Sequence, residues 1–176
     1  NNANFNTPAD GGRGRMQMYI WTAPTPDFDG SLDADIVIHE LTHGLSNRLH
    51  GNASGLSGLN MSRALGEGWS DFYAHAMLSE PADPINGIYA LSGYARYGAV
   101  PSFNNYYYGI RRFPKAVMGF TGPNGRPHNP LTFNDIDPTK ADLSDGAFAP
   151  GFSQTADGVH AGGEIWSSAL WEIRAR

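Results

Sequence analysis

The sequence predicts an α+β fold that is mainly helical, with a small region of strands and many loops. Residues 32–49 and 61–79 carry apolar side chains at helical spacing, whereas residues 16–21 alternate in the way that is typical of a strand. The 22 glycines and 12 prolines are scattered, which indicates many ordered turns and not low complexity. With 176 residues, the chain is long enough for one domain with a substantial core.

The first expected elements are a strand over Met16–Trp21 and a helix from about 32 to 49. Ser31 is the candidate N-cap of this helix, and Asp33 and Asp35 would lie in its first turn, where the helix dipole favours anions. Apolar residues surround most of its circumference, which indicates a buried helix. These residues are Ile36, Val37, Ile38, Leu41, Leu45 and Leu49.

The remaining elements follow from composition and periodicity. A loop of glycine, asparagine and serine over 51–60 precedes a second helix over 61–79. Residues 89–97 are predicted as a short helix. Residues 98–158 show few periodic runs, so this long stretch is either functional or contains elements that periodicity does not show. An amphipathic helix over 162–175 is expected to follow.

Composition excludes several classes of function. The formal net charge is −5 and the basic residues are scattered, which argues against a nucleic-acid partner. No apolar run is long enough to cross a membrane. The absence of cysteine excludes disulfides, thiolate metal sites and cysteine nucleophiles. Any metal must therefore be held by histidine, aspartate or glutamate.

The segment from His39 to His43 predicts a zinc site on the first helix. Positions i and i+4 share one helix face, so both imidazoles can reach one zinc ion at about 2.0–2.1 Å. Glu40 lies beside that face, where it can take a proton from a zinc-bound water. The pattern also occurs by chance, but a buried helix without metal would leave three polar groups unsatisfied. The H-x-x-G-x-x-H extension is excluded, because Ser46 and Leu49 occupy its glycine and histidine positions.

A catalytic zinc needs a third protein ligand, and Glu67 on the second helix is the best candidate. Asp71 lies one turn further on the same face, where it could accept the free N–H of a ligand histidine. Gly66 and Gly68 flank the glutamate, which makes sense if backbone packs closely beside the site. His75 is the alternative third ligand, although a histidine near a helix end is more often a core residue.

A calcium site is a weaker prediction. Asp27–Gly30 and Asp33 offer the hard oxygen ligands that calcium prefers. Their spacing does not follow the EF-hand, and helix capping with a solvated turn is favoured for them.

Ile38–Leu49 and Gly66–Phe72 resemble the fungalysin family of extracellular zinc metallopeptidases, which are relatives of thermolysin. The resemblance covers almost the whole chain and implies a zincin-type catalytic core with two active-site helices. Further matching segments, in the same order, are Asn1–Asn4, Gly14–Met18, Asp33–Val37, Gly109–Arg112 and Val159–Trp166.

The resemblance implies a role for each of several residues. It makes His39, His43 and Glu67 the zinc ligands and Glu40 the general base and acid. His160 resembles the histidine that stabilises the oxyanion of the transition state.

The resemblance also implies residues that bind substrate. Asn2 and Ala3 resemble the edge segment that binds substrate backbone. Either Arg111 or Arg112 resembles the arginine that binds a substrate carbonyl beyond the scissile bond.

The chain departs from thermolysin at the partners of His160. Gly58 stands where thermolysin has a tyrosine that acts with this histidine. Thr155 stands where it has the aspartate that orients the ring, and Asp157 is the nearest acid here.

The sequence thus predicts one metallopeptidase core over 1–176. It would comprise an edge-strand segment over 1–30, a zinc-binding helix pair over 31–80, and loops with a C-terminal helix over 81–176. Compared with the family, an upstream propeptide, much of the N-terminal sheet region and the end of the helical lobe are expected to be absent.

The expected function is that of a secreted, monomeric zinc endopeptidase acting on proteins or peptides, with a propeptide as inhibitor. The alternatives are an inactive zinc-binding module that needs a missing lobe, and an exopeptidase, for which no added acidic anchor is seen. Cleavage before hydrophobic residues is a weak expectation from the resemblance.

Overall fold

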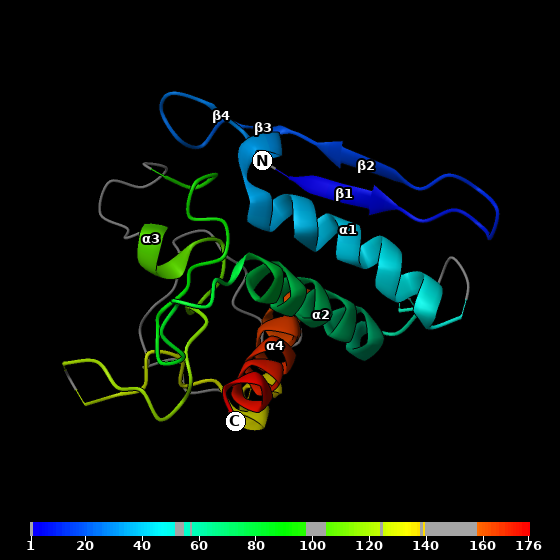
Figure 1. Cartoon of the computed structure of the whole chain (residues 1–176). Coiled ribbons are helices and arrows are strands. Elements are labelled where there is room, and N and C mark those ends of the chain that lie inside the picture. The colour runs from blue at the N-terminus through cyan, green and yellow to red at the C-terminus, as the bar shows by residue number, and fades with distance from the viewer. Residues whose placement is uncertain are drawn as a thin grey trace.

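The computed structural model describes residues 2–51, 55–56, 58–97, 105–123, 125–137, 139 and 158–176 (Figure 1). The predicted α+β fold with mainly helical content is confirmed. The strands are β1 (Ala3–Asn6), β2 (Arg15–Met18), β3 (Ile20–Trp21) and β4 (Phe28–Asp29). The α-helices are α1 (Ala34–Leu49), α2 (Asn60–Leu78), α3 (Asn105–Tyr108) and α4 (Val159–Ala175), and the 3-10 helices are η1 (Gly30–Leu32) and η2 (Phe133–Ile136).

An antiparallel hairpin of β1 and β2 lies along α1 (Figure 1). Phe5 of β1 packs directly on Gly44 of α1, where any Cβ would clash with the phenyl ring. Further along, Asn47 Nδ2 donates to Thr7 Oγ1 at 3.2 Å. The sequence places a glycine where the strand approaches most closely, and this fixes the hairpin beside the helix that carries the HExxH segment.

The N-terminus of α1 is capped differently from the prediction. Ser31 is not the N-cap, because it lies inside η1, where its N–H donates to Asp29 Oδ1 at 2.9 Å. Asp33 has the extended backbone of an N-cap and accepts from the N–H of Asp35 at 3.1 Å. A carboxylate therefore caps the helix that the serine was expected to cap.

The prediction that α1 is buried nearly all round is wrong. Leu41, Leu45 and Leu49 lie on one stripe of the helix, and they are 51%, 48% and 73% exposed. The hairpin covers one side of α1 and α2 covers another (Figure 1), and no described element covers this third side. Apolar residues on all sides of a helix therefore do not show how many of those sides pack against another helix or strand.

Helices α2 and α4 cross at a pair of glycines. A Cβ on Gly68 would lie 2.6 Å from the carbonyl oxygen of Gly163, and a Cβ on Gly163 would lie 2.7 Å from Glu67 Cβ. The expected close approach of backbone beside Glu67 is thus found at Gly68. No such close approach is found at Gly66, since a Cβ there would lie at an ordinary contact distance of 3.5 Å from Leu56 Cβ.

We expect Gly68→Ala to lower the free energy of unfolding by about 2 kcal/mol, because backbone on the facing helix cannot give way as a side chain can. This loss outweighs the gain of about 1 kcal/mol in helix propensity. Urea denaturation checks it. The matched control is Gly66→Ala in the same helix, which should be neutral or stabilising. Equal effects at both positions would contradict the close crossing.

Residues 89–97 do not form the predicted short helix. Tyr89 forms two backbone hydrogen bonds with Lys115, and Leu91 O accepts from the N–H of Ile110 at 2.9 Å. These backbone groups are therefore engaged with a distant segment and cannot serve a helix. Conversely, the described parts of 98–158 contain two short helices, α3 and η2, which the periodicity of the sequence did not predict.

Helix α4 begins at Val159, before the predicted start at 162. The N–H of Gly162 donates to Gly158 O at 2.9 Å, so the adjacent glycines continue the helix. His160 is consequently held in the first turn of a helix.

The hydrophobic core beside α1 contains side chains from the strands and from the segment that follows α2. Trp21, Ile36 and Ala95 are its buried centre, with Met18 and Phe28 packed against it. No helix in the described ranges has the length and hydropathy that a membrane span requires.

Candidate metal centre

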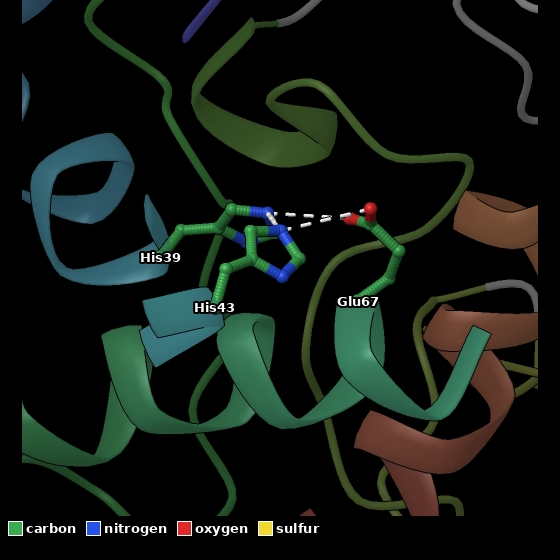
Figure 2. A group of neighbouring side chains, drawn as sticks. All are labelled: His39, His43 and Glu67. Carbon is green, nitrogen blue, oxygen red and sulfur yellow. Dashed lines mark hydrogen bonds and ion pairs between the residues drawn. The ribbon is translucent and has the colours of Figure 1, made fainter. Parts of the chain in front are cut away.

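Three side chains from α1 and α2 converge on one point (Figure 2). His39 and His43 project from the same face of α1, and Glu67 faces them from α2. The Nε2 atoms of the histidines are 3.0 Å apart. Glu67 Oε2 lies 3.2 Å from His39 Nε2, and Glu67 Oε1 lies 3.6 Å from His43 Nε2.

This triangle of donor atoms fits a zinc ion. Zinc bonds of about 2.0–2.1 Å in tetrahedral geometry put neighbouring ligand atoms about 3.3 Å apart. The separations of 3.0, 3.2 and 3.6 Å lie around that value. Two imidazoles and one carboxylate are also a known ligand set of catalytic zinc, which keeps a fourth position open. In the part of the chain that the structure describes, this is the one such cluster.

Asp71 lies behind His39, as predicted from the spacing. Its Oδ1 is 2.8 Å from His39 Nδ1, so the imidazole is oriented with Nε2 toward the other two ligands. Asp71 is also held by Arg111, whose Nε and Nη2 donate to the two carboxylate oxygens at 2.7 Å each. All three residues are buried, so His39 is held by its ion pair with Asp71, which the two charge-assisted hydrogen bonds from Arg111 fix in turn.

The electrostatics of the cluster favour a cation at the ligand triangle. Burial opposes charge on His39, but hydrogen bonds to Asp71 and Glu67 outweigh it and raise its pKa to about 9. Burial likewise opposes ionisation of Glu67, but His39 and the other histidines lower its pKa to about 2. Burial and the charge on His39 together lower the pKa of His43 to about 4. The carboxylates thus hold a proton on His39 at a point where a metal cation can replace it.

Glu40 lies beside the triangle and is not one of its members. It is buried, and burial raises its pKa to about 7. Glu40 lines a cavity of about 230 Å³ together with His39, Arg111 and His160. We call this the metal-side cavity. A carboxyl group in the wall of this cavity can exchange a proton with a group bound inside it.

His160 reaches the same centre from α4. Its Nε2 lies 3.4 Å from Glu67 Oε2, and its side chain is 55% exposed. Partial desolvation by the surrounding residues, followed by the charge of Arg111, lowers the pKa of His160. Thr155 and Asp157 lie outside the described residues. Gly58 is exposed and offers no side chain in place of a tyrosine.

The two candidate arginines lie in different surroundings. Arg111 lines the metal-side cavity, whereas Arg112 donates through Nε to Glu164 Oε2 at 2.6 Å and through Nη2 to Ala161 O at 2.8 Å. Glu164 Oε1 also accepts from the N–H of Arg112 at 2.6 Å. This geometry makes Arg111 the better candidate for substrate binding. Arg112 ties its own segment to the first two turns of α4.

His75, the rival ligand, lies away from the triangle. Its Nδ1 is 3.0 Å from the backbone oxygen of Asp71, and its ring packs edge-on against Trp171. Two of the three carboxylates of the suggested calcium site serve as helix caps, Asp29 at η1 and Asp33 at α1.

The metal-side cavity also contains residues that sequence reasoning missed. Asn2 and Ala3 line it as expected, but so do Trp21, Ser92 and Arg96. No periodicity or motif marks the last two, because they reach the cavity through contacts between distant segments. Asp33 and Asp35, which were predicted at the helix start, also bind the segment that carries Ser92, but nothing in the sequence indicates that pairing.

A larger cavity of about 460 Å³ lies between α2, α4 and η2. Its walls are mainly apolar, and its one acidic residue, Glu172, accepts from the N–H of Met118. None of the ligand triangle lines it. The chemistry therefore belongs to the smaller cavity.

Comparison with known proteins gives a consistent family match. The profile of the family described as Fungalysin metallopeptidase (M36) matches residues 1–176. The chain is 41% identical over 175 residues to an "Extracellular metalloproteinase mep" of Aspergillus fumigatus. The aligned region covers 98% of this chain and 23% of that protein. It is 39% identical to "Extracellular metalloproteinase 2" of Trichophyton rubrum, with the same coverage of each chain. The chain thus spans about a quarter of the length of these relatives.

Proposed function

The chain belongs to the fungalysin family of metallopeptidases, and on that premise we propose that it is a zinc-dependent endopeptidase. The observation that carries the proposal is the ligand triangle of His39, His43 and Glu67 with Glu40 beside it in one cavity. Zinc bound there would act as a Lewis acid and lower the pKa of a coordinated water.

Glu40 is proposed to move the proton. It takes a proton from the attacking water and passes it to the nitrogen of the leaving amine, so one carboxyl group acts as base and then as acid. Its burial keeps the carboxylate poorly solvated and its pKa close to neutral, which suits transfer in both directions. Asp71 keeps His39 in the tautomer that presents Nε2 to the metal.

His160 and Arg111 are proposed to bind the reacting part of the substrate. Both line the metal-side cavity, and His160 Nε2 lies within 3.4 Å of a ligand oxygen. A donor at that position can stabilise the oxyanion that develops at the scissile carbonyl. Asn2 and Ala3, at the start of β1, are proposed to bind substrate backbone as an added strand.

The setting of the reaction is also a proposal. The relatives quoted above are named extracellular metalloproteinases, so we propose a secreted protein that acts on protein substrates.

Removal of metal tests the proposed function. We expect the purified chain to cleave casein and a peptide blocked at both ends, because its cleft needs no free terminus. Cleavage should stop with 1,10-phenanthroline and return when zinc chloride is added in excess. Gel electrophoresis and mass spectrometry of the products measure both effects.

Three results would contradict the proposal. Cleavage that persists at full rate with the chelator would exclude metal-dependent hydrolysis. Stoichiometric zinc without cleavage would favour the alternative, a zinc-binding module that needs a further part of the longer protein. Activity confined to peptides with a free N-terminus would point to an exopeptidase.

A further inference from the structure

The metal-side cavity has an apolar wall and a cationic side chain. Trp21, Ile36 and Ile110 line it, as does Arg96. Apolar walls alone would suit an aliphatic substrate side chain. A guanidinium in such a wall changes what the cavity can accept, since an apolar group placed against it would remove its water without replacing the hydrogen bonds.

Arg96 has no acidic partner among the described residues. Every ion pair found for an arginine there belongs to Arg48, Arg111 or Arg112. Its Nε is buried and has no hydrogen-bond partner in the described part of the chain. Burial lowers its pKa, but a guanidinium remains charged at any physiological pH. A half-buried, unpaired arginine is an incomplete site for an anion.

The position of Arg96 is fixed by the helix that carries the ligands. Asp35 Oδ2 accepts from the N–H of Ser92 at 2.9 Å, and Asp33 Oδ2 accepts from the N–H of Ala95 at 3.0 Å. Ala95 is fully buried in the core cluster. The segment before Arg96 is therefore held at two points to the first turn of α1, the helix that carries His39 and Glu40.

Ser92 adds a second polar group to the same wall. It is fully buried, and its Oγ has no partner among the described residues. Its φ of 57° is in the left-handed region, which costs a non-glycine residue free energy and persists only where the surroundings impose it. Ser92 is among the residues that line the metal-side cavity, but its hydroxyl is covered, so the site for an anion rests on the guanidinium of Arg96.

We propose that the metal-side cavity selects a substrate residue with a carboxylate side chain, glutamate above all, next to the scissile bond. The carboxylate pairs with Arg96, while the methylene groups of the side chain lie against Trp21 and Ile36. This inference rests on the proposed peptidase function, and it names the substrate class for that site. It replaces the weak expectation of a preference for hydrophobic residues.

Cleavage-site mapping tests the selection. Digestion of an end-blocked peptide library should enrich glutamate and aspartate at one of the two positions that flank the cleaved bond. Three matched peptides with glutamate, glutamine or leucine at that position then separate charge from hydrogen bonding. We expect kcat/KM to be about tenfold higher for glutamate than for leucine, since a hydrogen-bonded charge pair that is partly exposed contributes an effect of that order.

Arg96→Met isolates the guanidinium, because methionine keeps an unbranched apolar side chain at the position. The preference for glutamate over leucine should disappear or reverse. Arg63→Met, at an exposed position of α2 outside the cavity, is the matched control and should keep the wild-type ratio. A hydrophobic preference that is the same in the wild type and in Arg96→Met would overturn the proposal, as would equal cleavage of the glutamate and glutamine peptides.

A binding measurement separates this inference from the proposed function. With zinc-loaded Glu40→Gln, isothermal titration calorimetry compares the affinity of the glutamate and leucine peptides without turnover. If the wild type cleaves nothing, the peptidase proposal fails, and tighter binding of the glutamate peptide still supports the pocket. Equal affinities would refute the pocket whether or not the chain is active.

Discussion

Glu40→Gln is expected to lower kcat by about 10²–10⁴ and to leave the zinc content unchanged. Glutamine keeps the size of the side chain and fills the same space beside the ligand triangle. It cannot accept a proton from water, so the step assigned to Glu40 is lost while His39, His43 and Glu67 are untouched.

Two measurements on the same sample decide this prediction. Zinc per chain is measured by atomic emission after dialysis, and kcat is measured on an end-blocked peptide. Glu80→Gln, a matched change at an exposed position, should retain both values. Cleavage by Glu40→Gln at more than a tenth of the wild-type kcat would show that another group takes the proton.

The convergence of the three candidate ligands could be predicted because their geometry is local. His39 and His43 are one helical turn apart, and that spacing holds in any α-helix. Glu67 required a longer inference across a loop, but it and Asp71 are again one turn apart on a single helix. Each prediction therefore needed only helix geometry and the assumption that α1 and α2 are adjacent.

The groups that surround the ligands could not be predicted in the same way. Arg111 binds Asp71 across 40 positions, and Ala95 binds Asp33 across 62. Such pairings are set by the packing of the whole chain, and no local pattern distinguishes Arg111 from Arg112. Even with the family resemblance, both arginines remained open as candidates, and Arg96 carried no signal.

The same limit explains the errors in α1. Ser31 is a good N-cap residue in isolation, but Asp29 draws its N–H into a 3-10 turn and leaves Asp33 as the cap. The exposed stripe of Leu41, Leu45 and Leu49 shows that apolar character alone does not place a neighbour on each face. Periodicity predicts that a helix forms, and the elements around it decide its boundary and its exposure.

Asp71→Asn is expected to weaken zinc binding by about 10–100-fold, because Asp71 orients His39 and increases its basicity. It should also lower the free energy of unfolding by about 3–5 kcal/mol, because Arg111 is left as a buried charge without its partner. Competition with a chelating dye measures the first effect and urea denaturation of the zinc-free protein measures the second. Asp10→Asn removes an exposed partner of Arg48. It should change neither the free energy of zinc binding nor that of unfolding by more than about 1 kcal/mol.

The double variant Asp71→Asn/Arg111→Met separates the two roles of Asp71. Removal of both charges abolishes the unpaired guanidinium, and a buried ion pair can be replaced by neutral groups at little cost in stability. We therefore expect the free energy of unfolding to recover most of its loss, while zinc affinity stays low because His39 still lacks its carboxylate. If zinc affinity recovered together with stability, Asp71 would act on the metal only by holding the fold.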